Sequence, residues 1–277
     1  MRGLGLRPSP SLKRMRFAAF RPSGVAAFPP SATLVACAPP VMDQRQSNSC
    51  TGHGGSGGAY TACAAKGNPL PFVPSQRGVY GDARCEERTM LSDGSLAPLK
   101  DEGATIADVI GALEKSGVRK MGPLNGSAFS DVTAVNVNDP PTLAEDEESA
   151  RDLLVGAYAI ANGSNLGAHI ADAIANHKAP VIIGVYVDTA FEQWGENASP
   201  SKAPLDGAPD ASDPNGGGHC MYIIGYRTES TGSLSFQIRN SWGPDIGVHG
   251  DWWVTERWLA AALWEAYALD VTPKAAS

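Results

Sequence analysis

Residues 42–60 read MDQRQSNSCTGHGGSGGAY, a polar segment of turn-forming residues that ends at Cys50 and is followed by a run of small residues. The run contains no proline and stops at Gly67-Asn68-Pro69, so we expect a helix from Thr51 to Lys66. Each glycine in such a helix costs about 1 kcal/mol relative to alanine, so tertiary packing must hold it. A cysteine that opens a helix meets unpaired N–H groups and the positive end of the dipole, which favour the reactive thiolate.

Two later segments complete a candidate catalytic set. Gly216-Gly217-Gly218-His219 leads into an expected strand that fixes the imidazole, and its glycines allow another part of the chain to approach closely. Arg239-Asn240-Ser241-Trp242-Gly243 places an amide at the end of another expected strand, beside a large aromatic side chain. A Cys–His pair needs a third group to orient the imidazole, and an asparagine oxygen does this without adding charge. Taken singly, the three are ordinary core or turn residues. The combination in the order Cys, His, Asn indicates nucleophilic catalysis.

The remaining patterns place helices mainly in the first half of the chain and strands in the second. Helices are expected at 73–87, 106–117 and 169–177, and strands at 181–187, 221–226, 234–238 and 251–255. This order indicates an α+β protein of two lobes rather than an alternating α/β protein. We expect an irregular N-terminal arm over 1–40 and a mainly helical lobe with the nucleophile over 41–140. A mainly β lobe with the histidine and asparagine follows over 141–277, and an acidic run at 145–148 reads as solvated.

Composition narrows the function further. Hydrophobic residues make up 43% of the 277 residues and charged residues 18%, which allows a sizeable core. The net charge of −7 argues against a nucleic-acid partner, and no run approaches the roughly 18 apolar residues of a membrane span. The five cysteines are an odd number without a paired CxxC, so they do not form a disulfide framework and one is a candidate reactive thiol.

These segments resemble the papain-like (C1 family) cysteine peptidases, most closely the bacterial and phage-type branch, which often has Ser-Cys-Thr at the nucleophile. Gln44 stands six residues before Cys50, as the oxyanion-hole glutamine of that family does. The resemblance runs from about Leu34 to Leu259. It implies the papain-like two-lobe fold, with a helical left lobe, an antiparallel β-barrel-like right lobe and the active cleft between them.

The resemblance also implies roles for individual residues. Cys50 would attack a peptide carbonyl as the thiolate of a pair with His219, and Gln44 and the Cys50 backbone N–H would hold the oxyanion. Asn240 would orient the imidazole, and Trp242 would shield that hydrogen bond from water. Besides Trp242, the substrate-lining residues would be Gly217 and Gly218. The expected partner is a peptide or protein substrate, and no metal or cofactor is expected.

Several alternatives remain open at this level. One is another Cys–His amide hydrolase or acyltransferase, and another is an inactive papain-fold component of a virion or complex. A zinc site built from Cys50, His53, His219 and Cys220 is a further option, although His53 reads better as a local polar contact and Cys220 as a core residue.

Ser47 stands where secreted members carry a disulfide cysteine. The arm is shorter than a typical inhibitory pro-segment, so we expect the arm to lie on the folded body. The compartment and the oligomeric state stay open, with a cytoplasmic location preferred to export, a lipoprotein leader at Leu34–Cys37 or a place in a virion.

Overall fold

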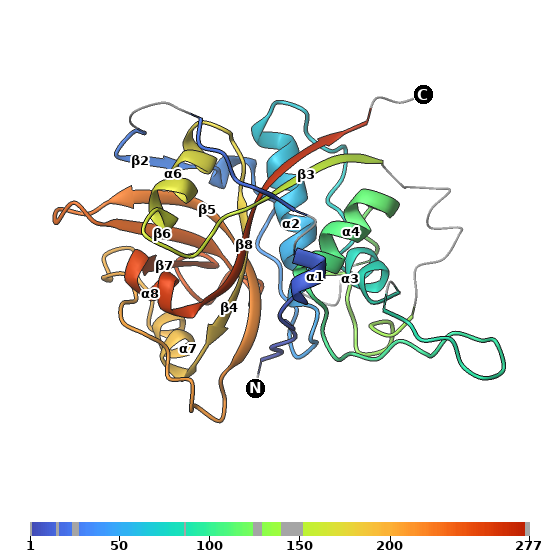
Figure 1. Ribbon diagram of the computed structural model, residues 1–277. Helices are drawn as coiled ribbons and strands as arrows, with labels where there is room; N and C mark the ends of the chain where they lie inside the picture. Colours follow the sequence, from blue (N-terminus) through green and yellow to red (C-terminus); the bar gives the residue numbers. More distant parts are fainter. Residues whose placement is uncertain are drawn as a thin grey trace.

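The computed structural model describes residues 2–14, 17–23, 28–85, 87–123, 129–139 and 152–274. Three helices, α2 (Cys50–Ala65), α3 (Gln76–Cys85) and α4 (Ile106–Ser116), pack together on one side of the molecule. Figure 1 shows them to the right, in cyan and green, with most of the sheet to the left. Among the described residues, no helix has the length and apolar character needed to cross a lipid bilayer.

The described strands form a single open sheet, so the barrel-like lobe implied by the resemblance is not closed in this part of the chain. Its order is β1-β3-β8-β4-β5-β6-β7, with β2 paired to β5, and every pair except β1–β3 is antiparallel. The strands are β1 (Ala18–Ala19), β2 (Ser31–Thr33), β3 (Leu153–Ala159), β4 (Val181–Val187), β5 (Gly217–Thr228), β6 (Leu234–Arg239), β7 (Asp251–Thr255) and β8 (Leu263–Pro273).

The other helices of the described chain lie in the N-terminal region or between the later strands. They are α1 (Ser11–Arg14), the 3-10 turn η1 (Val35–Cys37), α6 (Leu166–Ala175), α7 (Thr189–Glu196) and α8 (Glu256–Ala262). The core under α7 and α8 is aromatic: the ring of Phe191 stacks on Trp252 at 5.2 Å and on Trp258 at 5.4 Å between centroids. Trp242 meets the same cluster edge-on, at 5.7 Å from Phe191. This cluster anchors the sheet end that carries the candidate asparagine segment.

The glycine-rich helix α2 is stable because its neighbours approach its backbone closely. A Cβ atom on Gly52 would lie 2.6 Å from the Cβ of Tyr80 in α3. A Cβ on Gly54 would lie 2.8 Å from the Cys220 sulfur in β5. The glycines therefore lower the helix propensity of α2, but they allow it to pack tightly against both α3 and the sheet. They also fix the beginning of α2 against the beginning of β5.

The helices and strands expected from the sequence are present with small shifts at their ends. The helices expected at 51–66, 73–87, 106–117 and 169–177 are α2, α3, α4 and α6, and the four expected strands are β4, β5, β6 and β7. The sequence did not indicate β3, β8, α7 or α8. β8 reads LWEAYALDVTP, which has no two-residue alternation, because it is a central strand between β3 and β4 and its middle residues are buried in core clusters on both faces of the sheet. The expected lobe junction at residues 140 and 141 and the acidic run at 145–148 lie outside the described residues.

Candidate active site

Cys50 is the first residue of α2, and its side chain is fully buried. Burial raises the pKa of the Cys50 thiol to about 11, against hydrogen bonds from the backbone of Cys220, Gly5 and Thr51 that act to lower it. In this arrangement desolvation outweighs the helix N-terminus, so the cysteine is a neutral thiol. All five cysteines are free thiols.

The loop that leads to Cys50 is fastened at two points. The backbone N–H of Gln44 donates to the carbonyl of Ser241 at 2.9 Å, and the Ser241 hydroxyl donates to Gln44 Oε1 at 2.6 Å. Further along, the backbone N–H of Asn48 donates to both carboxylate oxygens of Asp101 at 3.1 Å. The Asn48 side-chain amide donates to the Asp101 carbonyl at 2.7 Å. These hydrogen bonds hold the loop in place, although Ser47 stands where secreted members of the papain-like family carry a disulfide cysteine.

His219 lies in β5, Asn240 directly follows the neighbouring strand β6, and both side chains are buried. The imidazole Nε2 lies 2.8 Å from Asn240 Oδ1. The same oxygen accepts the backbone N–H of Ser241 at 2.7 Å, which identifies it as the amide oxygen. Nε2 therefore carries the proton, and Nδ1 is the free acceptor of the neutral ring. Asn240 therefore selects the tautomer in which Nδ1 is free to accept a proton.

Trp242 covers one face of the His219 ring. The two rings stack with centroids 4.8 Å apart and planes inclined by 28°. Burial lowers the pKa of His219 to about 4, although the hydrogen bond to Asn240 acts to raise it. The neighbouring His53 lowers it further. In this arrangement the imidazole is neutral.

The start of α2, which carries Cys50, packs on the start of β5, which carries His219. The Cys50 thiol is hydrogen-bonded to the backbone of Cys220, the residue that follows His219. His219 Nδ1 is buried and has no hydrogen-bond partner among the described residues. Burial raises the pKa of Cys50 and lowers that of His219, and thus favours the neutral form of each group over an ion pair.

The N-terminal residues occupy the groove beside these groups. The side-chain amide of Gln44 donates to the carbonyl of Gly3 at 3.0 Å, and Gly5 contacts the Cys50 thiol through its backbone. The backbone N–H of Leu6 donates to the carbonyl of Gly218 at 3.1 Å. In Figure 1 this blue segment passes between the helices and the sheet. The arm lies on the folded body as expected, but in the cleft itself, where it buries the nucleophile candidate.

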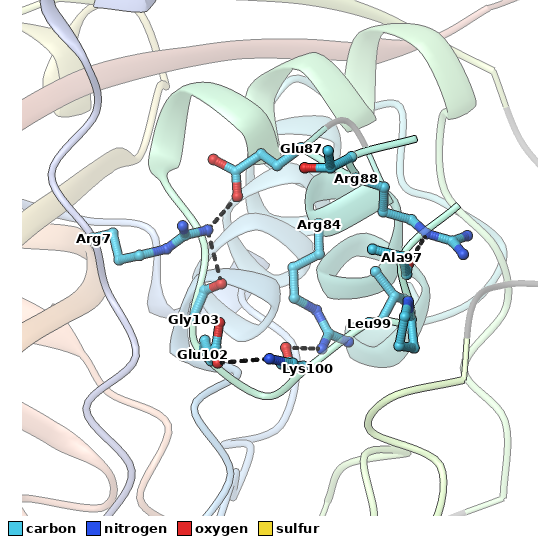
Figure 2. A pocket seen from close by; sticks show the side chains of 11 residues that line it. Arg7, Arg84, Glu87, Arg88, Ala97, Leu99, Lys100, Glu102 and Gly103 are labelled. Atoms are coloured by element: carbon cyan, nitrogen blue, oxygen red, sulfur yellow. Dashed lines mark hydrogen bonds and ion pairs between the residues drawn. The ribbon is translucent and has the colours of Figure 1, made fainter. Parts of the chain in front are cut away.

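Ionic contacts fix the arm where it leaves the groove. Arg7 pairs with Glu87 and also donates to the carbonyl of Gly103 at 3.1 Å. Figure 2 shows these contacts at the edge of a cavity of about 250 Å³. Beyond it, the Ser9 hydroxyl donates to the buried carboxylate of Glu265 at 2.9 Å. The arm therefore bridges the helical side and β8.

The expected substrate-lining residues all contact the arm. Gly217 faces Leu4, and a Cβ atom on it would lie 3.2 Å from the end of that side chain. Gly218 contacts Leu6 through its backbone. At the end of the groove, the guanidinium of Arg2 donates to the Trp242 carbonyl at 3.2 Å and lies over its ring.

The other candidate side chains from the sequence, His53 and Cys220, make contacts within the folded core. His53 uses both ring nitrogens: Nδ1 lies 2.9 Å from the Ser49 carbonyl and Nε2 lies 3.0 Å from the Ser130 hydroxyl. It is a local polar contact, as expected. Cys220 is buried in the core under α2. Within the described ranges, no cluster of three or more histidine, cysteine, aspartate or glutamate side chains is arranged to hold a metal ion.

Sequence reasoning missed three parts of this site. Asp101 and Ser241 fasten the nucleophile loop, a role that no local pattern indicates, because their partners are distant in the chain. The third part is the arm. Its alternation of glycine and leucine from Gly3 to Leu6 is a two-residue period typical of an extended segment, and that signal was available.

Known proteins resemble this chain in structure rather than in sequence. No family model matches the sequence, and no curated protein sequence matches it either. Xylellain, a cysteine protease from Xylella fastidiosa, aligns with 23% identity over 100% of this chain and 97% of its own, with a TM-score of 0.69. A procathepsin B from Trypanosoma congolense aligns with 12% identity over 98% of this chain and 87% of its own, with a TM-score of 0.64. The bromelain protease from Ananas comosus, solved in complex with the E64 inhibitor, aligns with 15% identity over 90% and 100%, with a TM-score of 0.56.

These similarities establish the papain-like α+β fold for this chain.

Proposed function

We propose that this chain is a cysteine peptidase with Cys50 as its nucleophile, held in a latent state by its own N-terminal residues. The observation that carries the proposal is the 2.8 Å hydrogen bond between His219 Nε2 and Asn240 Oδ1. It leaves Nδ1 as a base with no other partner in the described structure. Cys50 opens a buried helix, and its thiol contacts the backbone of Cys220, the residue after His219. The papain-like fold supports the same conclusion.

In the first half of the reaction, the Cys50 thiol gives its proton to Nδ1 of His219. The thiolate then attacks the carbonyl carbon of the scissile peptide bond. The Gln44 amide, now occupied by the Gly3 carbonyl, donates to the oxyanion that forms. A donor of this kind contributes about 3 kcal/mol in a comparable hydrolase. His219 next protonates the leaving amine, which leaves a thioester between Cys50 and the acyl group.

In the second half, His219 takes a proton from water, and the resulting hydroxide attacks the thioester carbonyl. The carboxylic acid leaves, and the Cys50 thiol is restored with the proton that His219 held. Asn240 keeps the proton on Nε2 throughout, so each transfer takes place at Nδ1. Trp242 excludes water from this hydrogen bond by covering the ring.

Latency follows from the groove being filled. Cys50 has no exposed surface, and the Gln44 donor is already used by the arm. A substrate peptide therefore has to displace the residues before Pro8. Displacement admits water, removes the desolvation that keeps Cys50 and His219 neutral, and favours the thiolate–imidazolium pair.

The test is labelling by an epoxide inhibitor of thiol peptidases, together with hydrolysis of a mixed peptide library. A chain that lacks residues 1–8 should be labelled at Cys50 alone at neutral pH, and the full chain much more slowly. Cys50→Ser in the shortened chain should abolish hydrolysis, while Cys63→Ser serves as the matched control. Hydrolysis that persists in Cys50→Ser, or labelling spread evenly over all five cysteines, would exclude a peptidase built on Cys50.

A further inference from the structure

The arm shows how an extended chain fits this groove. Leu6 pairs with Ala104 as in a parallel β-bridge, since the Ala104 N–H donates to the Gly5 carbonyl and the Arg7 N–H donates to the Ala104 carbonyl, each at 3.1 Å. Successive side chains of an extended chain point to opposite sides. Glycines and leucines therefore face opposite walls of the groove.

The wall on the glycine side is the nucleophile loop, and it touches the arm backbone. A Cβ atom on Gly3 would overlap the carbonyl oxygen of Ser47, and one on Gly5 would overlap the carbonyl oxygen of Asn48, both far inside contact distance. These are backbone atoms, and Asn48 is held by its bonds to Asp101. This wall therefore cannot move aside for an added methyl group, as a flexible side chain could.

The opposite wall accepts bulky apolar side chains. Leu4 lies against Gly217, and Leu6 lies against Gly184 with almost no exposed surface. A Cβ atom on Gly184 would lie 2.8 Å from the end of Leu6 and 3.3 Å from the end of Ile106. The glycines of β4 and β5 thus leave the space that the leucines fill.

We propose that the groove selects peptides of the form Gly-Leu-Gly-Leu, with glycine facing Ser47 and Asn48 and a leucine-sized apolar side chain facing β4 and β5. As a statement about substrates, the proposal rests on the proposed function. The two walls define the ligand class whether or not the bound peptide is cleaved. The specificity is steric on the loop side and hydrophobic on the sheet side.

The first experiment uses the full chain with Gly5→Ala. Since the added methyl group cannot fit against Asn48, the arm should leave the groove, and alkylation of Cys50 by iodoacetamide should accelerate about tenfold or more. Gly163→Ala is the matched control, because a Cβ atom there meets nothing within 4 Å. Gly3→Ala is the second variant and should act like Gly5→Ala. Wild-type labelling rates in both arm variants would overturn the proposal.

The second experiment adds peptides to the Gly5→Ala protein. The hexapeptide Arg-Gly-Leu-Gly-Leu-Arg, which copies residues 2–7, should protect Cys50 from alkylation. The same peptide with alanine in place of both glycines should protect about tenfold less well or worse. Equal protection by the two peptides would disprove the glycine requirement.

Both readouts measure occupancy of the groove, so they separate this inference from the peptidase proposal. Selective protection without hydrolysis of any peptide would leave the ligand class standing and remove the peptidase. Hydrolysis at equal rates of peptides with and without glycine at these positions would support the peptidase and disprove the proposed ligand class.

Discussion

At the scale of single residues, Asn240 determines the tautomer and the orientation of the His219 imidazole, the candidate base. Its side-chain oxygen is oriented by the N–H of Ser241 and in turn accepts Nε2–H of His219. An unoriented imidazole samples both tautomers and several ring rotations, and only one combination offers Nδ1 to the thiol. The amide therefore acts by positioning the ring and adds no charge to the site.

Asn240→Ala in the chain lacking residues 1–8 should reduce kcat about ten- to hundredfold without abolishing it, because a buried hydrogen bond worth about 1–3 kcal/mol is lost. The measurement is steady-state peptide hydrolysis across pH. Asn162→Ala, at an exposed position, is the control and should match the parent. A parent-like rate in Asn240→Ala would show that the ring is oriented by its packing on Trp242 alone.

At the scale of elements, α4 supports the wall on which the arm lies. Its N-cap, Thr105, accepts the backbone N–H of Asp108, and the residue before it, Ala104, forms the bridge to Leu6. The beginning of α4 is thus fixed by a side chain directly next to the groove. A loosened cap should disturb both the helix and the seat of the arm.

Thr105→Ala should lower the free energy of unfolding by about 1 kcal/mol, within the usual range for an N-cap. Thr105→Ser keeps the capping oxygen and should lose only a small part of that stability. Urea unfolding followed by circular dichroism measures the difference. An alanine variant as stable as the serine variant would show that the cap contributes nothing here.

At the scale of the whole molecule, closure of the groove links the protonation of the site to stability. Burial holds the pKa of His219 at about 4, below its ordinary value of 6.5. An opened or unfolded chain binds a proton below pH 6.5, whereas the closed chain resists it down to about pH 4. The stability contributed by neutral His219 is therefore present above pH 6.5 and lost as the pH falls toward 4. Burial lowers the pKa of His53 as well, with the same sign.

The full chain should therefore unfold at a lower urea concentration at about pH 5 than at about pH 7. His219→Gln removes one of the two imidazoles whose pKa burial lowers, so the difference between the two pH values should shrink. Buried Asp251, whose pKa is raised, acts in the opposite direction, but it is common to both proteins and cancels in the comparison. Equal pH dependence in the two proteins would show that His219 is not desolvated in solution.

The sequence by itself determined the elements whose signals are local. Helix α4 has a regular apolar period and ends at Gly117, β4 is a continuous apolar run, and the order of Cys50, His219 and Asn240 indicated the papain-like fold that the structural relatives establish. The roles of these three residues remain a prediction. Each of the three residues stands in a short sequence motif that suits its expected role, so the motifs can be recognised in the sequence alone.

Only the tertiary structure decided what depends on contacts between distant residues. β8 became a strand because β3 and β4 flank it, and α2 tolerates its glycines because Tyr80 and Cys220 pack against them. The arm occupies the groove because Ser47, Asn48 and Gly218 fit its backbone. Such fits depend on the shapes of surfaces that form only when the chain has folded, so no local pattern specifies them.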